Sequence, residues 1–312
     1  MAVDANLTFD DFVGNAQSVT KIRLLIEDAI NIPHMGFVGA SGNGKTTMAK
    51  IVADHMKRRF VYINSVAVKD SMVFRGLITH PENMKFGAII VLDECHRLLA
   101  SVQDHLLSVT EEPAELVTTH KGVLVRDKLP EHMSFIFATT HSGQMRDALL
   151  SRLEIIEFGE YSTEEKQIIA AKYFNRAHHL KGSQMAPSAI MEIGRRARSG
   201  RHVVRICDNI IRYMRINKVD KVTVDIVNAV FIILGIDLNG LTTRDVLLLG
   251  YLETNGRCGL STLEAYLNTP QKDIREKIEP YLLRVGLIER QMSGRAITHR
   301  GMKALRGERI DV

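Results

Sequence analysis

The sequence lacks the long apolar run that a membrane-spanning helix needs. No window approaches about 18 uninterrupted apolar residues, and the start, Met-Ala-Val-Asp-Ala-Asn, lacks the basic beginning and apolar middle of a signal peptide. Cysteine is scarce too, because only Cys95, Cys207 and Cys258 occur and none forms a Cys-x-x-Cys pair. We therefore expect a cytoplasmic protein without membrane segments or disulfides. The lack of His-Glu-x-x-His and of Cys/His clusters argues against zinc.

A large excess of one charge is missing as well, but the charges are unevenly distributed. The 312 residues carry a net charge of +5 and are enough for two or three domains. Residues 1–158 contain 16 Lys and Arg against 19 Asp and Glu, whereas the counts are 13 against 8 in residues 159–238 and 12 against 9 in residues 239–312. A basic C-terminal half suits a polyanionic partner, and an ordinary solvated surface explains such modest excesses nearly as well.

A phosphate-binding motif is present in the N-terminal third. Gly39-x4-Gly44-Lys45-Thr46 is a complete P-loop signature, with an apolar stretch before it and a helical pattern after it. Glycines let backbone N–H groups close around an anion, lysine supplies a point charge, and threonine offers a hydroxyl to Mg²⁺. A Gly-rich turn before a helix is the weaker alternative. The motif predicts binding of a nucleoside triphosphate.

Apolar segments that alternate with helical patterns predict an α/β fold with a parallel sheet for residues 1–160. Helical patterns cover residues 18–30 and 98–109, and residues 116–126 alternate around a Lys-Gly turn, which indicates a β-hairpin. Apolar runs typical of buried parallel strands follow the P-loop at Phe60–Asn64, Gly87–Glu94 and Phe135–Thr140, and Glu154–Phe158 is expected to be a last short strand.

The pattern becomes helical after Glu160 and changes again near residue 237. Four amphipathic segments, with caps at Ser162, Ser188 and Thr223, predict an all-helical lid over residues 161–236. In residues 237–312, three short helices precede two strands around a Ser-Gly turn, which predicts a winged-helix domain.

Several polar residues have the chemistry that nucleotide hydrolysis needs. Asp93 and Glu94 close a buried strand, where one carboxylate can serve Mg²⁺ and the other can orient water. Thr139 and Thr140 end the next strand, where a hydroxyl could lie beside the γ-phosphate or hold the water, although threonine is common at strand ends. Arg152 has the position of an arginine that reaches a neighbouring subunit, and Arg205 that of one touching phosphates from the lid. Each arginine, taken alone, is more often a surface charge.

With these residues in place, the chain resembles the AAA+ ATPases and, more closely, the RuvB family of Holliday-junction branch-migration motors. The resemblance extends from Phe9 to about Leu305. Asp-Glu-x-His-Arg-Leu and Glu-Pro-Tyr-Leu are much more specific than a P-loop alone. The segments that carry it are Phe9-Asp-Asp-Phe-Val-Gly-Asn, the P-loop, Leu92-Asp-Glu-Cys-His-Arg-Leu, Ala138-Thr-Thr, Leu150-Ser-Arg, Ile206–Arg215, Gly259-Leu-Ser-Thr-Leu and Glu279-Pro-Tyr-Leu.

The resemblance implies ATP and Mg²⁺ as cofactors and a role for each matching residue. Phe12 and Val13 would lie near adenine, and Thr46 with Asp93 would hold Mg²⁺. Glu94 would be the catalytic base, Thr140 the sensor-1 residue, Arg152 the arginine finger and Arg205 the sensor-2 arginine. The phosphate-binding residues would be Gly39, Gly42, Asn43, Gly44, Lys45, Thr46 and Thr47.

The resemblance also implies partners. The chain would form a homo-oligomeric ring, a hexamer, and act on duplex or four-way junction DNA. Arg295 in the wing would contact the DNA backbone, and the hairpin at residues 116–125 lies where the family docks the junction-binding protein RuvA. The sequence departs from the family pattern at Ala40-Ser41, Leu150, Leu153 and residues 201–204, so we interpret it as a divergent member.

Three functions remain compatible with the sequence. The first is an ATP-driven motor that drives branch migration in recombination and repair. The second is a helicase loader or initiator that uses ATP as an assembly switch. The third, a winged-helix regulator with a vestigial ATPase, fits less well because Lys45, Asp93 and Glu94 are intact.

Overall fold

Buried apolar strands form the centre of the N-terminal part of the molecule. Residues 88–92 and 134–139 are almost fully buried, because helices cover both faces of a parallel sheet and leave such strands no solvent side. The sheet has the strand order β2-β3-β6-β1-β7, and every pairing is parallel. Its strands are β1 (Met35–Gly39), β2 (Arg59–Asn64), β3 (Ala88–Asp93), β6 (Ser134–Thr139) and β7 (Glu154–Phe158).

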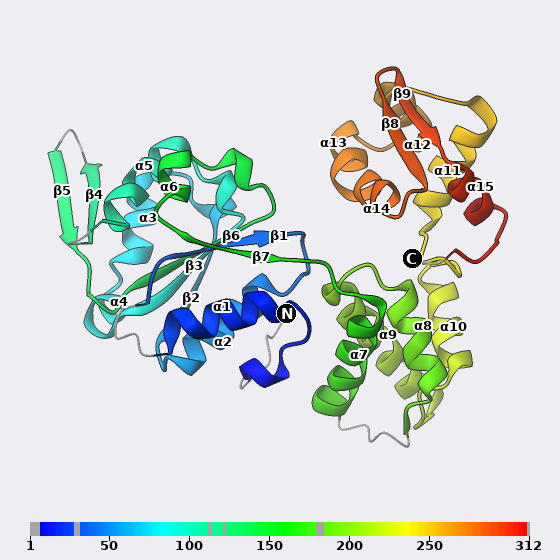
Figure 1. The fold of residues 1–312 in the computed structure, drawn as a ribbon, viewed down its shortest axis with the longest axis horizontal. Helices are drawn as coiled ribbons and strands as arrows, with labels where there is room; N and C mark the ends of the chain where they lie inside the picture. The colour runs from blue at the N-terminus through cyan, green and yellow to red at the C-terminus, as the bar shows by residue number, and fades with distance from the viewer. Residues whose placement is uncertain (1–6, 28–31, 112–113, 121–122, 179–183, 311–312) are drawn as a thin grey trace. The chain divides into compact units, whose positions relative to one another are not determined.

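The structure, a computed structural model, describes two compact units, Met1–Tyr161 and Ser162–Val312 (Figure 1). No helix in the part of the chain that it describes is long and apolar enough to cross a membrane. The described residues are 7–27, 32–111, 114–120, 123–178 and 184–310.

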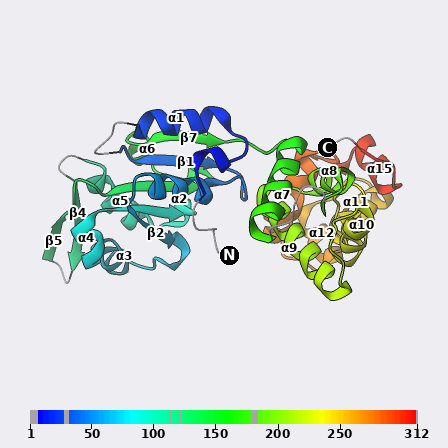
Figure 2. The ribbon, with the colours of Figure 1, turned by 90° about the horizontal axis from the view of Figure 1, so that it is seen from below.

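Helices cover the two faces of the sheet in the first unit (Figures 1 and 2). The first two helices pack with Phe37 and Ile136 on one face, and α3, α5 and α6 pack with Phe135 and Phe137 on the other. A two-stranded antiparallel hairpin, β4–β5, lies outside the sheet and confirms the predicted hairpin. The elements are α1 (Ala16–Ile26), α2 (Lys45–His55), α3 (Ser71–Ile78), α4 (Pro81–Phe86), α5 (Ala100–Val109), α6 (Asp147–Leu150), β4 (Glu115–His120) and β5 (Val123–Lys128).

The second unit contains two apolar cores. One is buried among helices α7 to α10, with Phe174 and Phe231 at its centre, and the other among the elements from α11 onward, with Leu248 and Leu282. The elements are α7 (Thr163–His178), α8 (Pro187–Arg196), α9 (Gly200–Asn217), α10 (Val224–Ile233), α11 (Thr243–Asn255), α12 (Leu260–Leu267), α13 (Gln271–Asp273), α14 (Glu279–Arg284), α15 (His299–Leu305), β8 (Ile288–Gln291) and β9 (Gly294–Ile297).

Capping explains where the helices of this unit begin. Ser162 caps α7, since its hydroxyl accepts from the Glu165 N–H at 3.1 Å and the Glu165 carboxylate accepts from the Ser162 N–H at 2.8 Å. Thr223 caps α10. The predicted cap at Ser188 is wrong, because α8 already begins at Pro187, whose ring sets the backbone angle of a first helical residue.

A buried ion-pair cluster fastens the wing to α14. The Glu279 side chain is fully buried, and its carboxylate accepts from Arg295 Nε at 2.6 Å and from Arg290 Nη2 at 2.5 Å. Arg295 also exchanges two backbone hydrogen bonds with Cys258, at 2.8 and 3.1 Å. One carboxylate therefore holds both strands of the wing against the helix.

Within the second unit, Arg198 connects the helices α7 to α10 with the elements from α11 onward. Its guanidinium donates to the Gly240 carbonyl at 2.7 and 3.0 Å, forms an ion pair with the buried Asp245, and lies 3.9 Å from the ring centroid of Tyr281. A partly buried cation with this many partners is a rigid connection.

Replacing Glu279 by glutamine should destabilise the second unit. The buried side chain would lose its charge, and Arg295 and Arg290 would lose their ion-pair partner, which costs about 3 kcal/mol. Burial disfavours the ionised Glu279, but hydrogen bonds from Arg295 and Arg290 outweigh it and hold the pKa of this carboxyl below its usual value. Its contribution is therefore complete above about pH 4.3 and is lost as the pH falls through the lowered pKa.

Urea unfolding between pH 3 and pH 7 measures this effect. Glu279→Gln should lower the unfolding free energy at pH 7 and remove part of its acid dependence. The exposed Glu276→Gln on the preceding turn is the control and should change neither. Equal stability of the two variants at pH 7 would contradict the proposed role of the cluster.

Candidate nucleotide site

The P-loop has backbone angles and close contacts that demand glycine. Gly39 and Gly44 have φ angles of 155° and 90°, a region that other residues rarely adopt. A Cβ on Gly39 would lie 2.3 Å from the Phe158 carbonyl oxygen, and one on Gly44 would lie 2.5 Å from the Tyr161 hydroxyl. At Gly39 the close atom is a backbone oxygen that leaves no room for a side chain, whereas at Gly44 it is the end of a side chain, and the positive φ angle is what favours glycine.

The charged end of Lys45 lies in this loop. Lys45 is the first residue of α2 and is only 7% exposed, and its ammonium group donates to the Gly39 and Ala40 carbonyls at 2.6 and 3.0 Å. The helix N-terminus adds backbone N–H groups and a favourable dipole for an anion. Asn43 fixes the loop to β7, since its amide donates to the Phe158 carbonyl at 3.3 Å.

The structure brings Phe12 to the same loop. The Phe12 ring packs edge-on against Phe158, with centroids 6.3 Å apart, and a Cβ on Gly44 would lie 2.7 Å from it. Val13 follows Phe12 and is half-buried. An aromatic ring against the phosphate loop suits the predicted place beside an adenine base.

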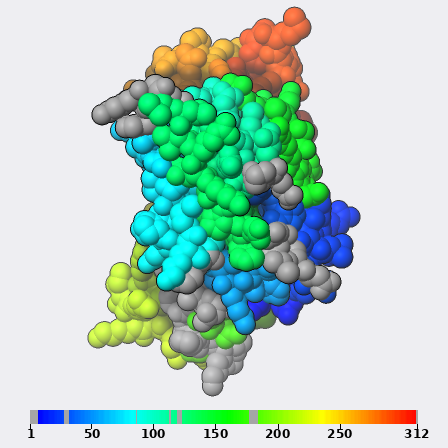
Figure 3. Space-filling model, turned by 90° about the vertical axis from the view of Figure 1, so that its left-hand side faces the viewer, coloured from blue at the N-terminus to red at the C-terminus, as the bar shows by residue number. Residues whose placement is uncertain are grey.

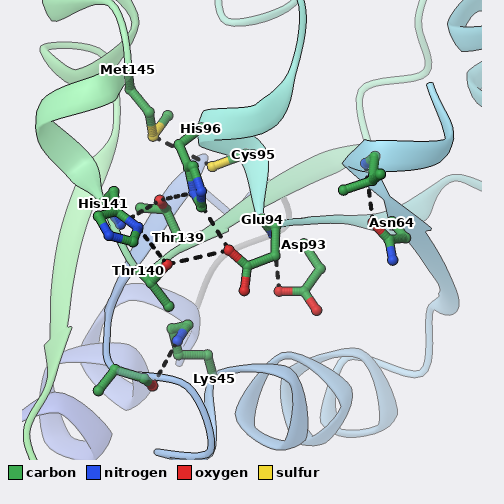
Figure 4. Close-up of polar contacts among 12 residues, drawn as sticks. Lys45, Asn64, Asp93, Glu94, Cys95, His96, Thr139, Thr140, His141 and Met145 are labelled. Atoms are coloured by element: carbon green, nitrogen blue, oxygen red, sulfur yellow. Dashed lines mark hydrogen bonds and ion pairs between the residues drawn. The ribbon is translucent and has the colours of Figure 1, made fainter. Parts of the chain in front are cut away.

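Asp93 and Glu94 lie together at the carboxyl end of β3, on the side of Lys45 (Figure 4). Asp93 accepts a hydrogen bond from the Tyr62 hydroxyl at 2.7 Å and another from the Glu94 N–H at 3.1 Å. Glu94 has a left-handed backbone, with φ 54°. Such conformations are costly and concentrate at functional sites.

A polar network surrounds the Glu94 carboxylate (Figure 4). Its Oε2 lies 3.2 Å from the Thr140 hydroxyl and 3.5 Å from His96 Nδ1. His96 Nδ1 also lies 2.9 Å from the Thr139 hydroxyl, and His141 Nδ1 lies 2.8 Å from the Thr140 hydroxyl.

Thr139 was expected at the site together with Thr140, whereas His96, His141 and Tyr62 were not among the expected residues. Two of them had a sequence signal, since His96 lies in the Asp-Glu-x-His-Arg-Leu motif and His141 follows Thr140 directly. Cys95 lies between the acid and the first histidine, and burial raises the pKa of its thiol to about 12, so it is a neutral packing residue.

The two predicted arginines have different surroundings. Arg152 forms an ion pair with Glu111 at 2.8 Å and donates to the Leu107 carbonyl at 2.8 Å, both in the same chain. Arg205 belongs to the second unit, where its side chain is exposed on α9. Near it, burial lowers the pKa of His202 to about 4, with the charge of Arg205 adding to the effect, so His202 is neutral.

The residues around the P-loop fit ATP and Mg²⁺. Thr46 in the first turn of α2 and Asp93 at the end of β3 offer hard oxygen ligands. Among the described residues, no group of three or more acidic, histidine or cysteine side chains could hold a metal ion by itself. Mg²⁺ is commonly bound by one or two protein ligands together with phosphate oxygens of the substrate.

The parallel sheet, the glycine loop that starts α2 and the two acids that end β3 define an α/β P-loop ATPase of the AAA+ class. Sequence models of two domains match the chain: the Holliday junction DNA helicase RuvB P-loop domain over residues 6–158 and the RuvB C-terminal winged helix domain over residues 238–306. Together they cover more than half of it. The chain belongs to the RuvB family.

Individual relatives agree with this assignment. The chain is 28% identical over 308 residues to the Holliday junction branch migration complex subunit RuvB of Ehrlichia ruminantium (strain Gardel), covering 95% of this chain and 90% of that protein. For the Ehrlichia chaffeensis protein of the same name the values are 29%, 95% and 91%. The solved Thermotoga maritima RuvB Holliday junction branch migration motor has a TM-score of 0.81 and 26% identity, and the match covers 97% of this chain and 98% of that one.

Gly39→Ala should abolish nucleotide binding. The added methyl group would overlap a backbone carbonyl that cannot move without breaking the β1–β7 pairing, and such overpacking costs about 1–3 kcal/mol. Thermal unfolding with and without Mg-ATP measures both effects. Gly76→Ala on α3 is the control, because its Cβ would meet nothing within 4 Å. A normal ATP-induced rise in Tm for Gly39→Ala would refute this reading of the loop.

Proposed function

We propose that this protein is an ATP-driven DNA motor that hydrolyses ATP in a ring and drives branch migration of four-way junctions in recombination and repair. The observation that carries the proposal is the grouping of Lys45, Asp93 and Glu94 at one sheet edge, in a chain whose C-terminal region matches the RuvB winged helix. We divide the chain into an ATPase domain (1–160), a lid (161–236) and a winged-helix domain (237–312).

Hydrolysis would use the residues of the P-loop unit. Phosphates would be bound by Lys45, by the backbone N–H groups of residues 39–44 and by Thr46 and Thr47, while Thr46 and Asp93 would hold Mg²⁺. Bound Mg²⁺ neutralises charge on the phosphate oxygens. Glu94 would accept the proton of the attacking water, and the Thr140 hydroxyl at 3.2 Å would fix the direction of its carboxylate.

A neighbouring subunit would complete the site. We assign Arg152 as the finger that enters the next subunit's site and Arg205 as the lid arginine that reads the phosphates. In the isolated chain Arg152 is paired with Glu111, so ring assembly would exchange a carboxylate partner for a phosphate. An ion pair with half-exposed members is weak enough for that exchange.

The winged-helix region would grip DNA through its phosphates. Arg295 has its guanidinium on the buried Glu279, so its effect on DNA would include holding the wing in shape. Arg257, exposed beside it and bound to the Ser293 hydroxyl at 2.7 Å, offers a further cation at the wing turn. Binding of this kind is salt-dependent and largely independent of sequence.

We also propose that β4–β5 docks a RuvA-like protein. Val123 and Leu124 are 65% and 55% exposed on β5, and the green hairpin segment lies at the surface in Figure 3. Apolar side chains on an uncovered hairpin are typical of a protein interface.

The three cysteines are free thiols, which suits work in the reducing cytoplasm.

Mixing two inactive variants tests the shared site. Lys45→Ala should abolish ATP binding, and Arg152→Ala should lower turnover by about 10³-fold or more. A ring that contains both variants has some sites with an intact lysine and an intact neighbouring arginine. Its ATPase rate should therefore exceed that of either variant alone. If the mixed rings had no higher ATPase rate, with ring formation verified by analytical ultracentrifugation, Arg152 would not be the residue that completes the neighbouring site.

Movement of DNA separates the motor from a loader. With a fluorescently labelled four-way junction, the wild-type protein, alone or with a RuvA-like protein, should convert the junction to duplexes in an ATP-dependent manner. Glu94→Gln should still bind ATP and assemble but leave the junction unchanged. Assembly and DNA binding by the wild type without any conversion would instead support the loader or initiator function.

A further inference from the structure

Two histidines and two threonines enclose one side of the Glu94 carboxylate. The Thr140 hydroxyl contacts Glu94 and His141 Nδ1, at 3.2 and 2.8 Å. The Thr139 hydroxyl accepts from the His141 backbone N–H at 3.0 Å and lies 2.9 Å from His96 Nδ1. The two imidazole rings meet edge-on, with centroids 4.9 Å apart. His141 is thus held at its backbone, at its ring and at Nδ1 (Figure 4).

The protons in this network can be assigned by counting donors. A hydroxyl has one proton to donate, and an ionised carboxylate only accepts. If Thr140 donated to His141, two oxygens, Thr140 Oγ1 and Glu94 Oε2, would face each other at 3.2 Å without a proton between them. Both contacts are satisfied only when His141 Nδ1–H donates to the Thr140 hydroxyl oxygen and the Thr140 hydroxyl donates its own hydrogen bond to Glu94.

We propose that His141 is a positioning residue for ATP hydrolysis, which keeps the Thr140 hydroxyl proton directed at Glu94 and thereby fixes the carboxylate that activates water. This inference rests on the proposed role of Glu94 as the base. His141 itself touches neither nucleotide nor water in this role, because it acts through Thr140. Its second contact, the ring edge against His96, is a packing contact that a side chain without any N–H could also make.

Two substitutions of His141 distinguish the effect of its Nδ1–H donor from the effect of its ring. In His141→Asn the side-chain amide can place an N–H near the position of Nδ1 but has no imidazole ring. In His141→Phe a ring of similar size remains against His96 but the donor is lost. We expect His141→Phe to lower kcat about tenfold, the effect of one hydrogen bond, at an unchanged KM for ATP. His141→Asn should recover most of that rate.

A double variant identifies the residue through which His141 acts. Thr140→Val removes the hydroxyl at nearly constant shape, so adding His141→Phe to it should cause little further loss of kcat. Multiplicative losses would mean that the two residues act separately and would overturn the proposal. Equal kcat values for His141→Asn and His141→Phe, whether normal or low, would also overturn it.

The same assay keeps this inference distinct from the proposed function. Glu94→Gln should eliminate hydrolysis while Mg-ATP still raises the Tm. If Glu94→Gln hydrolysed ATP normally, the assignment of the base would fail, whatever the His141 variants do. If Glu94→Gln were inactive and His141→Phe had a normal kcat, the base would stand and the role of His141 would fail.

Discussion

The nucleotide site depends on the register of five parallel strands. Gly39 lies opposite Phe158, Val38 opposite Thr139, and Asp93 opposite both Asn64 and Ala138. These pairings bring the loop, the acids and the threonines to one edge although more than a hundred residues separate them in the chain. A shift of one residue in any strand would turn its side chains to the other face. The buried apolar strands prevent that shift, so the core specifies the site.

Much of the fold was predictable because its signals are local. The P-loop spacing, the apolar strands and the helical periodicity each need only neighbouring residues, and they correctly indicated the sheet, the hairpin and the wing. Helices α3, α4 and α15 are short and were missed. The contacts of Thr140 with Glu94 and of Arg295 with Glu279 are settled by register and packing. The spacing of residues in the sequence therefore could not predict that Arg295 pairs with the buried Glu279.

The charge count of the C-terminal half also needs reinterpretation. Its basic excess suggested a surface for a polyanion, yet several of the arginines form ion pairs with carboxylates of the same unit. Glu192 pairs with Arg195, Arg196 and Arg309, and Glu279 with Arg290 and Arg295. Burial disfavours ionised Glu192, but its arginine partners outweigh this and lower its pKa. Fewer cations are therefore available for DNA than composition implies, and exposed ones such as Arg257 gain in importance.

The position of Arg198 has a mechanical consequence. It lies seven residues before Arg205 in the sequence: Arg198 precedes the N-cap Ser199, and Arg205 lies in the second turn of α9. At one end of this short segment is Arg205, which we assign to the phosphates. At the other end is Arg198, whose guanidinium contacts Gly240, Asp245 and Tyr281. A flexible tether would absorb a tilt of α9. The contacts of Arg198 with Gly240, Asp245 and Tyr281 would instead transmit a tilt of α9 to the wing.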